Sequence, residues 1–212
     1  GVMTTEDSWC DYGALSIASM LQEAYNDTSI SEIILEVNSG GGESMAGYII
    51  QNAVNDRNKP VKAYCHMVGS AAYNAVCSCD GIYLSNPASE AGSVGSYYSI
   101  NKQAVKWYKE TFDEIYAKQS TEKNDAIRAY FAGNKQPLFD KATEGAQTFI
   151  DTVHSYRPQV SNKIDAGKMF NANEALDNGL VDGILTNINS VVMQPVIDNK
   201  NFKNVQNNMD KF

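Results

Sequence analysis

The sequence predicts an α/β protein in which helices flank a mostly parallel sheet. Two short apolar runs, residues 33–37 and 61–65, are typical of buried strands. Each run is followed by a glycine-containing turn and then by apolar residues at helical spacing. A third run at residues 82–85 completes the order βαβαβ. This order implies right-handed crossovers and a functional site at the carboxyl ends of the strands.

The helices between these strands follow from apolar residues that recur every three or four positions. The first helix carries Leu15, Ile17, Met20, Leu21 and Ala24. The second carries Met45, Ile49, Ala53 and Val54. Asn58-Lys59-Pro60 is a stop signal that ends it before the next strand. A third helix is expected from about Ser70 to Cys79.

Further helices are expected beyond the third strand. Residues 102–116 and 138–156 are amphipathic at helical spacing, and a polar segment at residues 118–124 separates them. A short helix at residues 172–176 should end at Gly179.

The composition indicates one globular domain with a tail. At 212 residues, of which 43% are hydrophobic, the chain can bury a sizeable core. We place this domain at residues 1–186. Residues 187–212 contain seven asparagines and little periodicity, so we expect a tail or a docking arm for a partner.

The charge argues against two classes of partner. The formal net charge is −8, and residues 1–56 hold nine acidic residues and no lysine or arginine. An acidic surface does not attract nucleic-acid phosphates or an anionic membrane, so we expect neither as the main partner.

The sequence predicts no membrane span and no signal peptide. Eighteen apolar residues never occur in a row, and no basic segment precedes an apolar run at the N-terminus. We therefore expect a cytoplasmic protein. Gly1 in place of methionine indicates a processed or engineered start, and a membrane-associated form is expected if an N-terminal anchor was removed.

The four cysteines, Cys10, Cys65, Cys77 and Cys79, are too sparse for a disulfide scaffold and indicate a reducing compartment. A zinc site formed with His66 is the alternative. The usual CxxC spacing is missing, and residues two apart on a helix point in different directions. We expect buried core cysteines and no metal or other cofactor.

The residue best placed for chemistry is Ser70. It follows a strand across the turn at residues 67–69 and opens a helix, where free N–H groups favour negative charge. The N–H of Ala71 lies next to it, and Gly42 in the other strand-to-helix turn can bring a second N–H to the same spot. Two such donors form an oxyanion hole. Two alternatives remain. Ser70 could serve only as a helix N-cap, and the three glycines at residues 40–42 could form a general anion site.

A serine nucleophile also needs a base. The two histidines, His66 in or after a strand and His154 on a distant helix, are both expected to be structural, which disfavours a Ser-His-Asp triad. Lysine is the alternative where burial lowers its pKa from about 10.4 toward about 7 or 8. Nothing local in the sequence selects the lysine.

Residues 11–186 resemble the signal peptide peptidase A family of Ser-Lys serine peptidases. Four motifs occur in the family's order: an INSPGG-like turn at residues 37–42, an ASGGY-like nucleophile turn at 69–73, a TGSIG-like segment at 91–95 and a closing GLVD at 179–182. The resemblance implies the Clp protease/crotonase-like fold, with repeated ββα-type units and a mostly parallel sheet flanked by helices.

The resemblance also implies the site residues. Ser70 is the nucleophile, and the N–H groups of Gly42 and Ala71 form the oxyanion hole. The family's catalytic lysine lies in a KSGxxKD-like segment, and residues 118–124 match it with Lys123 in the catalytic place. Lys118 is the nearest rival, and a surface lysine in a polar loop is the alternative interpretation of Lys123.

Several residues depart from the family pattern. Gly40 replaces the usual proline, which should loosen the turn, and Asn124 stands where an acid is common. Around Ser70, Gly69 and the pair at residues 71–72 replace the alanine and glycines. The nucleophile, the donors and the lysine remain in place, so we expect an active enzyme.

The resemblance therefore implies a serine endopeptidase that forms a homo-oligomeric ring or dome, with Lys123 able to act in trans. A peptide substrate is expected to lie extended beside the strand edge at Gly41 and Gly42. The chain is most similar to compact phage or prophage members. Such members process capsid or scaffold proteins in the host cytoplasm, and signal peptides derived from membranes are the other expected substrate class. A crotonase-like acyl-CoA enzyme and a catalytically silent assembly protein stay open as alternatives.

Overall fold

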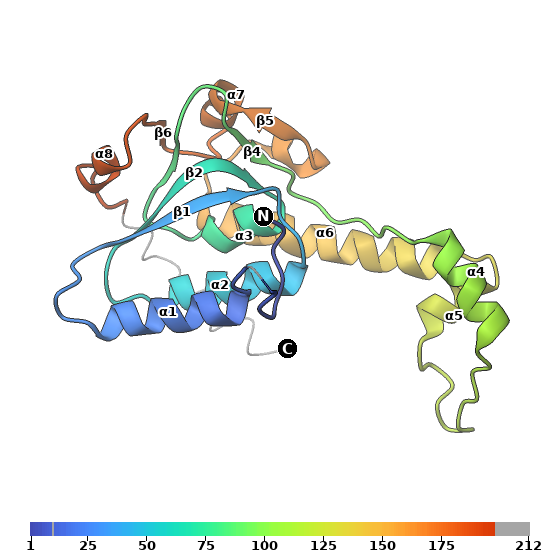
Figure 1. Ribbon diagram of the computed structural model, residues 1–212. Coiled ribbons are helices and arrows are strands. Elements are labelled where there is room, and N and C mark those ends of the chain that lie inside the picture. The colour runs from blue at the N-terminus through green and yellow to red at the C-terminus, as the bar shows by residue number, and fades with distance from the viewer. Residues whose placement is uncertain (10, 198–212) are drawn as a thin grey trace. The chain divides into compact units, whose positions relative to one another are not determined.

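The computed structural model describes residues 1–9 and 11–197. The chain divides into two compact units, which are described separately. Among the described residues, unit 1 combines residues up to 95 with residues 149–197, and unit 2 comprises residues 96–148. Unit 1 holds a sheet flanked by helices, which confirms the α/β class (Figure 1).

The sheet of unit 1 is built around one central strand. Its described strands are β1 Ile33–Ser39, β2 Val61–Gly69, β3 Ile82–Leu84, β4 Glu90–Gly92, β5 Met169–Asn171 and β6 Gly183–Ile184. β1 pairs with one edge of β2. On the other edge of β2, β3 pairs with residues 63–65 and β4 pairs with residues 67–69. These three pairings are parallel, and so is the pairing of β3 with β6. The pairing of β4 with β5 is antiparallel. The mostly parallel sheet is therefore confirmed.

The helices of unit 1 cover this sheet. They are α1 Ala14–Asn26, α2 Ser44–Asn55, α3 Ala71–Val76, α7 Ala172–Asp177, α8 Asn189–Val192, a 3-10 turn Asn162–Ala166 and the end of α6 Gln136–Tyr156. α1 packs on α2, and α2 packs on α3 (Figure 1). None of the described helices is long and apolar enough to cross a membrane.

The helical faces differ in part from those expected. Leu15 and Met20 of α1 are 48% and 44% exposed, and Met45 of α2 is 61% exposed. α1 instead buries Ala14, Leu21 and Tyr25, and α2 buries Ala46, Ile50, Ala53 and Val54. α2 and α3 approach closely at Gly47, where a built Cβ would lie 2.6 Å from the carbonyl oxygen of Ala71.

The three described cysteines of unit 1 are core residues. Cys65, Cys77 and Cys79 are fully buried and free of disulfides. Burial raises the pKa of all three thiols, that of Cys77 to about 12. The expectation of buried core cysteines is confirmed for these three, and Cys10 lies outside the described residues.

The described part of the Asn-rich segment packs against the sheet. Val191 of α8 is buried with Tyr64 and Tyr83. The buried Lys62 ammonium donates hydrogen bonds to the Val191 and Gln194 carbonyls, at 3.1 and 2.7 Å. Residues 198–212 lie outside the described residues, and a domain boundary at residue 186 stays a prediction.

Unit 2 is helical and buries little. It contains α4 Lys102–Thr111, α5 Asp125–Phe131 and the start of α6. α4 ends at Thr111, so the helix predicted to Tyr116 was too long, and α5 was not predicted. Ala126 and Leu138 are the buried hydrophobic residues found in it. Several large apolar side chains are exposed, namely Tyr97, Tyr98, Trp107, Phe112, Ile115, Ile127 and Phe139.

A buried ion pair in unit 1 links the end of α6 to the residue before β6 and, through it, to β3. Arg157, at the end of α6, is 1% exposed, and its guanidinium donates to both carboxylate oxygens of Asp182, at 2.7 and 3.2 Å. Asp182 also accepts a hydrogen bond of 2.7 Å from the Ile82 N–H of β3. Asp182 closes the GLVD motif, so that motif has a structural role here.

Replacing Asp182 by alanine should lower the free energy of unfolding by about 3–5 kcal/mol, because Arg157 would keep a buried charge without its partner. Urea denaturation measures this loss. Lys168→Ala is the control, since its pair with Glu174 is exposed and should contribute at most about 1 kcal/mol. Equal losses in the two variants would contradict the prediction.

Candidate active site

Ser70 stands in a strained turn between β2 and α3. Its backbone angles are φ 51° and ψ −125°, a region rare for residues other than glycine. Such a conformation costs on the order of 1–3 kcal/mol and is typical of functional positions. Ser70 occupies the N-cap position of α3, yet its side chain makes no capping hydrogen bond. A half-buried serine on a sharp strand-to-helix turn, with a hydroxyl that does not cap the helix, matches the nucleophile elbow of hydrolases.

The glycine turn after β1 lies directly against Ser70. Gly41 has φ 105°, and a Cβ built on it would lie 2.7 Å from the Ser70 Cβ and 2.8 Å from the Gly69 carbonyl oxygen. The chain therefore needs glycine at position 41 for both its conformation and its closeness to Ser70. Gly40 has neither requirement, since its Cβ would meet only the Met67 methyl group, at 3.7 Å.

Two backbone N–H groups are available beside Ser70. Ala71 is the first residue of α3, where the N–H has no partner within the helix. Gly42 follows the glycine that touches Ser70. Within the described residues, neither N–H donates a hydrogen bond. Such a pair can stabilise an oxyanion formed at Ser70.

The four sequence motifs meet around this turn. The Ser70 N–H donates to the Gly92 carbonyl of the TGSIG-like segment, at 2.9 Å. The Tyr73 hydroxyl, in the nucleophile motif, donates to the Leu180 carbonyl of the GLVD motif, at 2.8 Å. Gly41 of the INSPGG-like turn lies against Ser70 of the nucleophile turn. Each of the four motifs therefore contacts at least one other motif directly.

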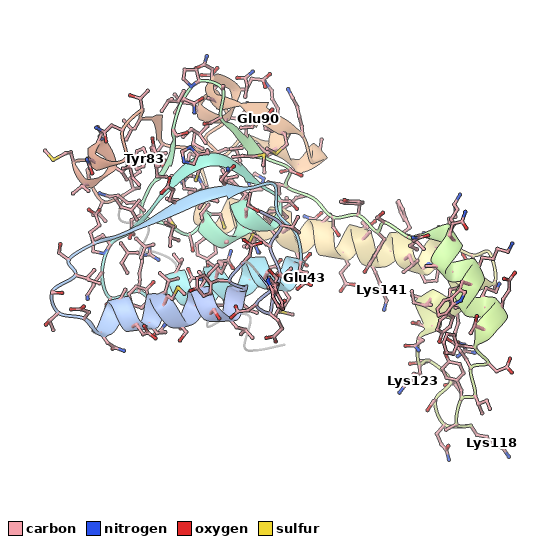
Figure 2. All side chains as sticks on the ribbon, in the orientation of Figure 1. Glu43, Tyr83, Glu90, Lys118, Lys123 and Lys141 are labelled. Carbon is pink, nitrogen blue, oxygen red and sulfur yellow. The ribbon has the colours of Figure 1, made fainter. Side chains whose placement is uncertain are left out.

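Lys123 belongs to unit 2, whereas Ser70 belongs to unit 1. Lys123 is exposed and lies in the turns before α5, where its backbone N–H donates to the Ser120 carbonyl, at 3.3 Å. Lys118 lies in the same connection between α4 and α5 (Figure 2). The structure thus gathers Gly41, Gly42, Ser70 and Ala71 in one unit, and the role of Lys123 stays a prediction.

The histidines have other partners. The two ring nitrogens of His66 lie 2.8 Å from the Ser85 hydroxyl and 2.9 Å from the Glu36 carboxylate. His154 pairs with Asp165, at 2.9 Å. Neither forms a hydrogen bond with Ser70 in the described part of the chain. No group of three or more side chains suited to hold a metal ion occurs there either.

Sequence reasoning missed the residues that cover the other side of the glycine turn. Met3 forms a parallel bridge with Gly42, and its N–H donates to the Gly41 carbonyl, at 2.9 Å. The Gly41 N–H donates to the Ser39 hydroxyl, at 3.1 Å, so both backbone groups of Gly41 on the strand edge predicted for substrate are already paired. The N-terminal residues carry no glycine pattern or periodicity that would have predicted this contact.

The fold is that of the Clp protease/crotonase class. No family model matches the chain. One similar solved structure is a mutant of ClpP1 from Listeria monocytogenes, with a TM-score of 0.53 and 14% identity over 84% of this chain and 86% of that one. Another is a mutant of the 1510-N membrane-bound stomatin-specific protease, with a TM-score of 0.55 and 15% identity over 91% and 81%. Identities this low establish the fold alone.

Among curated proteins, the chain is similar to Protease 4 of Haemophilus influenzae. The two are 24% identical over 181 residues, which cover 81% of this chain and 29% of Protease 4. The chain therefore spans less than a third of that relative.

Gly41→Ala should destabilise the fold by about 2–5 kcal/mol, because the new methyl group meets backbone atoms and the residue is strained at positive φ. Gly40→Ala is the matched control and should be neutral or stabilising by up to about 1 kcal/mol. Chemical denaturation of both variants tests the pair. A Gly41→Ala protein as stable as Gly40→Ala would show that the turn does not lie against Ser70.

Ser70→Gly should raise the free energy of unfolding by about 1–2 kcal/mol relative to Ser70→Ala. Both variants lose the hydroxyl, but only glycine relieves the positive φ. Thermal and urea unfolding of the two proteins measure the difference. A Ser70→Gly protein less stable than Ser70→Ala would contradict strain at this position.

Proposed function

We propose that the chain is a serine peptidase that cleaves peptide bonds through an acyl-enzyme on Ser70. The observation that carries the proposal is the strained turn at Ser70, whose Cβ lies against the glycine turn and whose hydroxyl makes no capping hydrogen bond. The similarity to Protease 4 supports it. Ser70 Oγ attacks the peptide carbonyl carbon, the N–H groups of Gly42 and Ala71 hold the oxyanion, and water releases the acyl group.

Lys123 is the proposed general base in a Ser-Lys dyad. It takes the proton of the Ser70 hydroxyl and returns it to the leaving amine. A lysine acts as a base only where burial favours its neutral form, and Lys123 is exposed within unit 2. The dyad therefore requires that substrate or a second copy of the chain cover this lysine.

A homo-oligomer, a ring or a dome, would provide that cover, with Lys123 acting in cis or in trans. The exposed apolar side chains of unit 2 support a protein partner, because so much apolar surface around only two buried hydrophobic residues is typical of an interface. The aromatic rings of Trp107, Tyr108 and Phe112 lie together there, with centroids 5.4 and 5.0 Å apart. Aromatic clusters are enriched at such contacts.

The proposed substrate is an extended peptide whose reacting carbonyl points at the Gly42 N–H. The N–H and the carbonyl of Gly41 are both paired, so main-chain hydrogen bonds to Gly42 would hold it. Phage capsid or scaffold proteins and membrane-derived signal peptides are the two proposed substrate classes, and the proposed location is the cytoplasm.

Substituting Ser70→Ala and Lys123→Ala separately should each lower the rate of peptide cleavage by about a thousandfold or more, with the circular dichroism spectrum unchanged. A library of quenched fluorescent peptides measures cleavage. Lys118→Ala, in the same connection, is the matched control and should cleave normally.

Other results would redirect the proposal. Cleavage retained by Lys123→Ala but lost in Lys118→Ala would assign the base to Lys118. Turnover of a CoA thioester by Ser70→Ala would favour a crotonase-like enzyme, which uses the same N–H pair without this serine. No cleavage by the wild-type protein would favour a silent assembly protein.

A further inference from the structure

The first five residues lie along the glycine turn of the candidate site, and we call residues 1–5 the N-terminal strap. The Gly1 nitrogen donates to the Asn38 carbonyl, at 2.9 Å, and the Ser39 hydroxyl donates to the Gly1 carbonyl, at 2.7 Å. The N-terminus lies beside the end of β1 in Figure 1. The strap is thus anchored next to the residues that lead into the turn.

Met3 binds both sides of Gly42. Its N–H donates to the Gly41 carbonyl and its carbonyl accepts from the Glu43 N–H, each at 2.9 Å. A Cβ built on Gly42 would lie 2.1 Å from the Met3 carbonyl oxygen and 2.6 Å from its nitrogen. Contact with the strap therefore requires glycine at position 42.

The bond from Met3 sets the direction of the Gly42 N–H. The Gly41 carbonyl and the Gly42 N–H belong to one planar trans peptide group, so they point in opposite directions. With the carbonyl held toward Met3, the N–H must point away from the strap. A peptide group between two glycines otherwise has unusual freedom to rotate, and a rotated group would present its carbonyl in place of the donor.

A side-chain clamp holds the strap to the start of α2. The Glu43 carboxylate accepts hydrogen bonds from the Thr5 N–H, at 2.8 Å, and from the Thr5 hydroxyl, at 2.6 Å. These two donors hold the pKa of the Glu43 carboxyl below its usual value. Glu43 lies at the start of α2 in Figure 2 and follows Gly42 in sequence, so the clamp acts beside the peptide group in question.

We propose that the strap is a positioning element that keeps the Gly42 N–H directed at the oxyanion. Met3 acts through its main chain, and Thr5 and Glu43 act through their mutual hydrogen bonds. This inference rests on the proposed function, because it assigns the strap a part in the oxyanion hole of that reaction.

A pair of variants at Met3 tests the proposal in the full chain. Met3→Pro removes the N–H that holds the Gly41 carbonyl, whereas Met3→Ala removes the side chain and keeps the N–H. The kcat of Met3→Pro for a peptide or ester substrate should be about 10- to 100-fold below that of Met3→Ala, since an oxyanion donor contributes about 10²–10³. KM should differ by less than about threefold between them, because the loss falls on the transition state.

A second pair avoids proline. Glu43→Gln keeps an oxygen that accepts from Thr5, and Glu43→Ala does not. The kcat of Glu43→Gln should exceed that of Glu43→Ala by about fivefold or more. Equal kcat values within both pairs, in an active wild-type background, would overturn the proposal.

Amide hydrogen exchange separates this proposal from the proposed function, because it needs no substrate. The Glu43 N–H should exchange at least about tenfold faster in Met3→Pro than in Met3→Ala, as the strap loosens. Equal exchange rates of the Glu43 N–H in the two variants would overturn the proposed role of the strap. A wild-type protein that fails to cleave overturns the peptidase instead, and the exchange result still decides whether the strap holds the turn.

Discussion

The candidate site depends on the close approach of two main-chain turns at the carboxyl end of β2. Ser70 follows the central strand in a strained conformation, and Gly41 of the neighbouring turn lies against it with no room for a side chain. The Gly92 carbonyl of β4 accepts the Ser70 N–H from another direction. A strained residue persists only where its surroundings determine its conformation, and here they do so from three elements of one sheet.

The sequence was informative about this part of the fold because the signals there are local. Apolar runs and turns predicted the order β1, α2, β2, α3, and the glycines and serine at the strand ends predicted where the turns would meet. Helical periodicity was less informative about which face of each helix is buried. Leu15, Met20 and Met45 fit a helical stripe but are exposed, because packing on neighbouring elements decides which side of a helix faces inward.

Contacts that span a long sequence distance without a pattern were not predictable. The strap reaches Gly41 and Glu43 through backbone groups, which every residue has, so no residue type marked it. The short α5 was missed because tertiary context, rather than a strong periodic signal, fixes so short a helix. Lys123 lies among turns in unit 2, and only the resemblance between motifs distinguished it from the other lysines.

The sparse burial in unit 2 has a consequence for how the protein would behave at different abundances. Unit 2 buries few apolar residues and exposes several aromatic side chains, so a partner that covers them would stabilise it. By mass action, the fraction of chains in which unit 2 is covered would then rise with the concentration of that partner. If the partner is another copy of the chain and Lys123 is its base, the specific activity would itself increase with the amount of protein present, and a dilute preparation would be nearly silent.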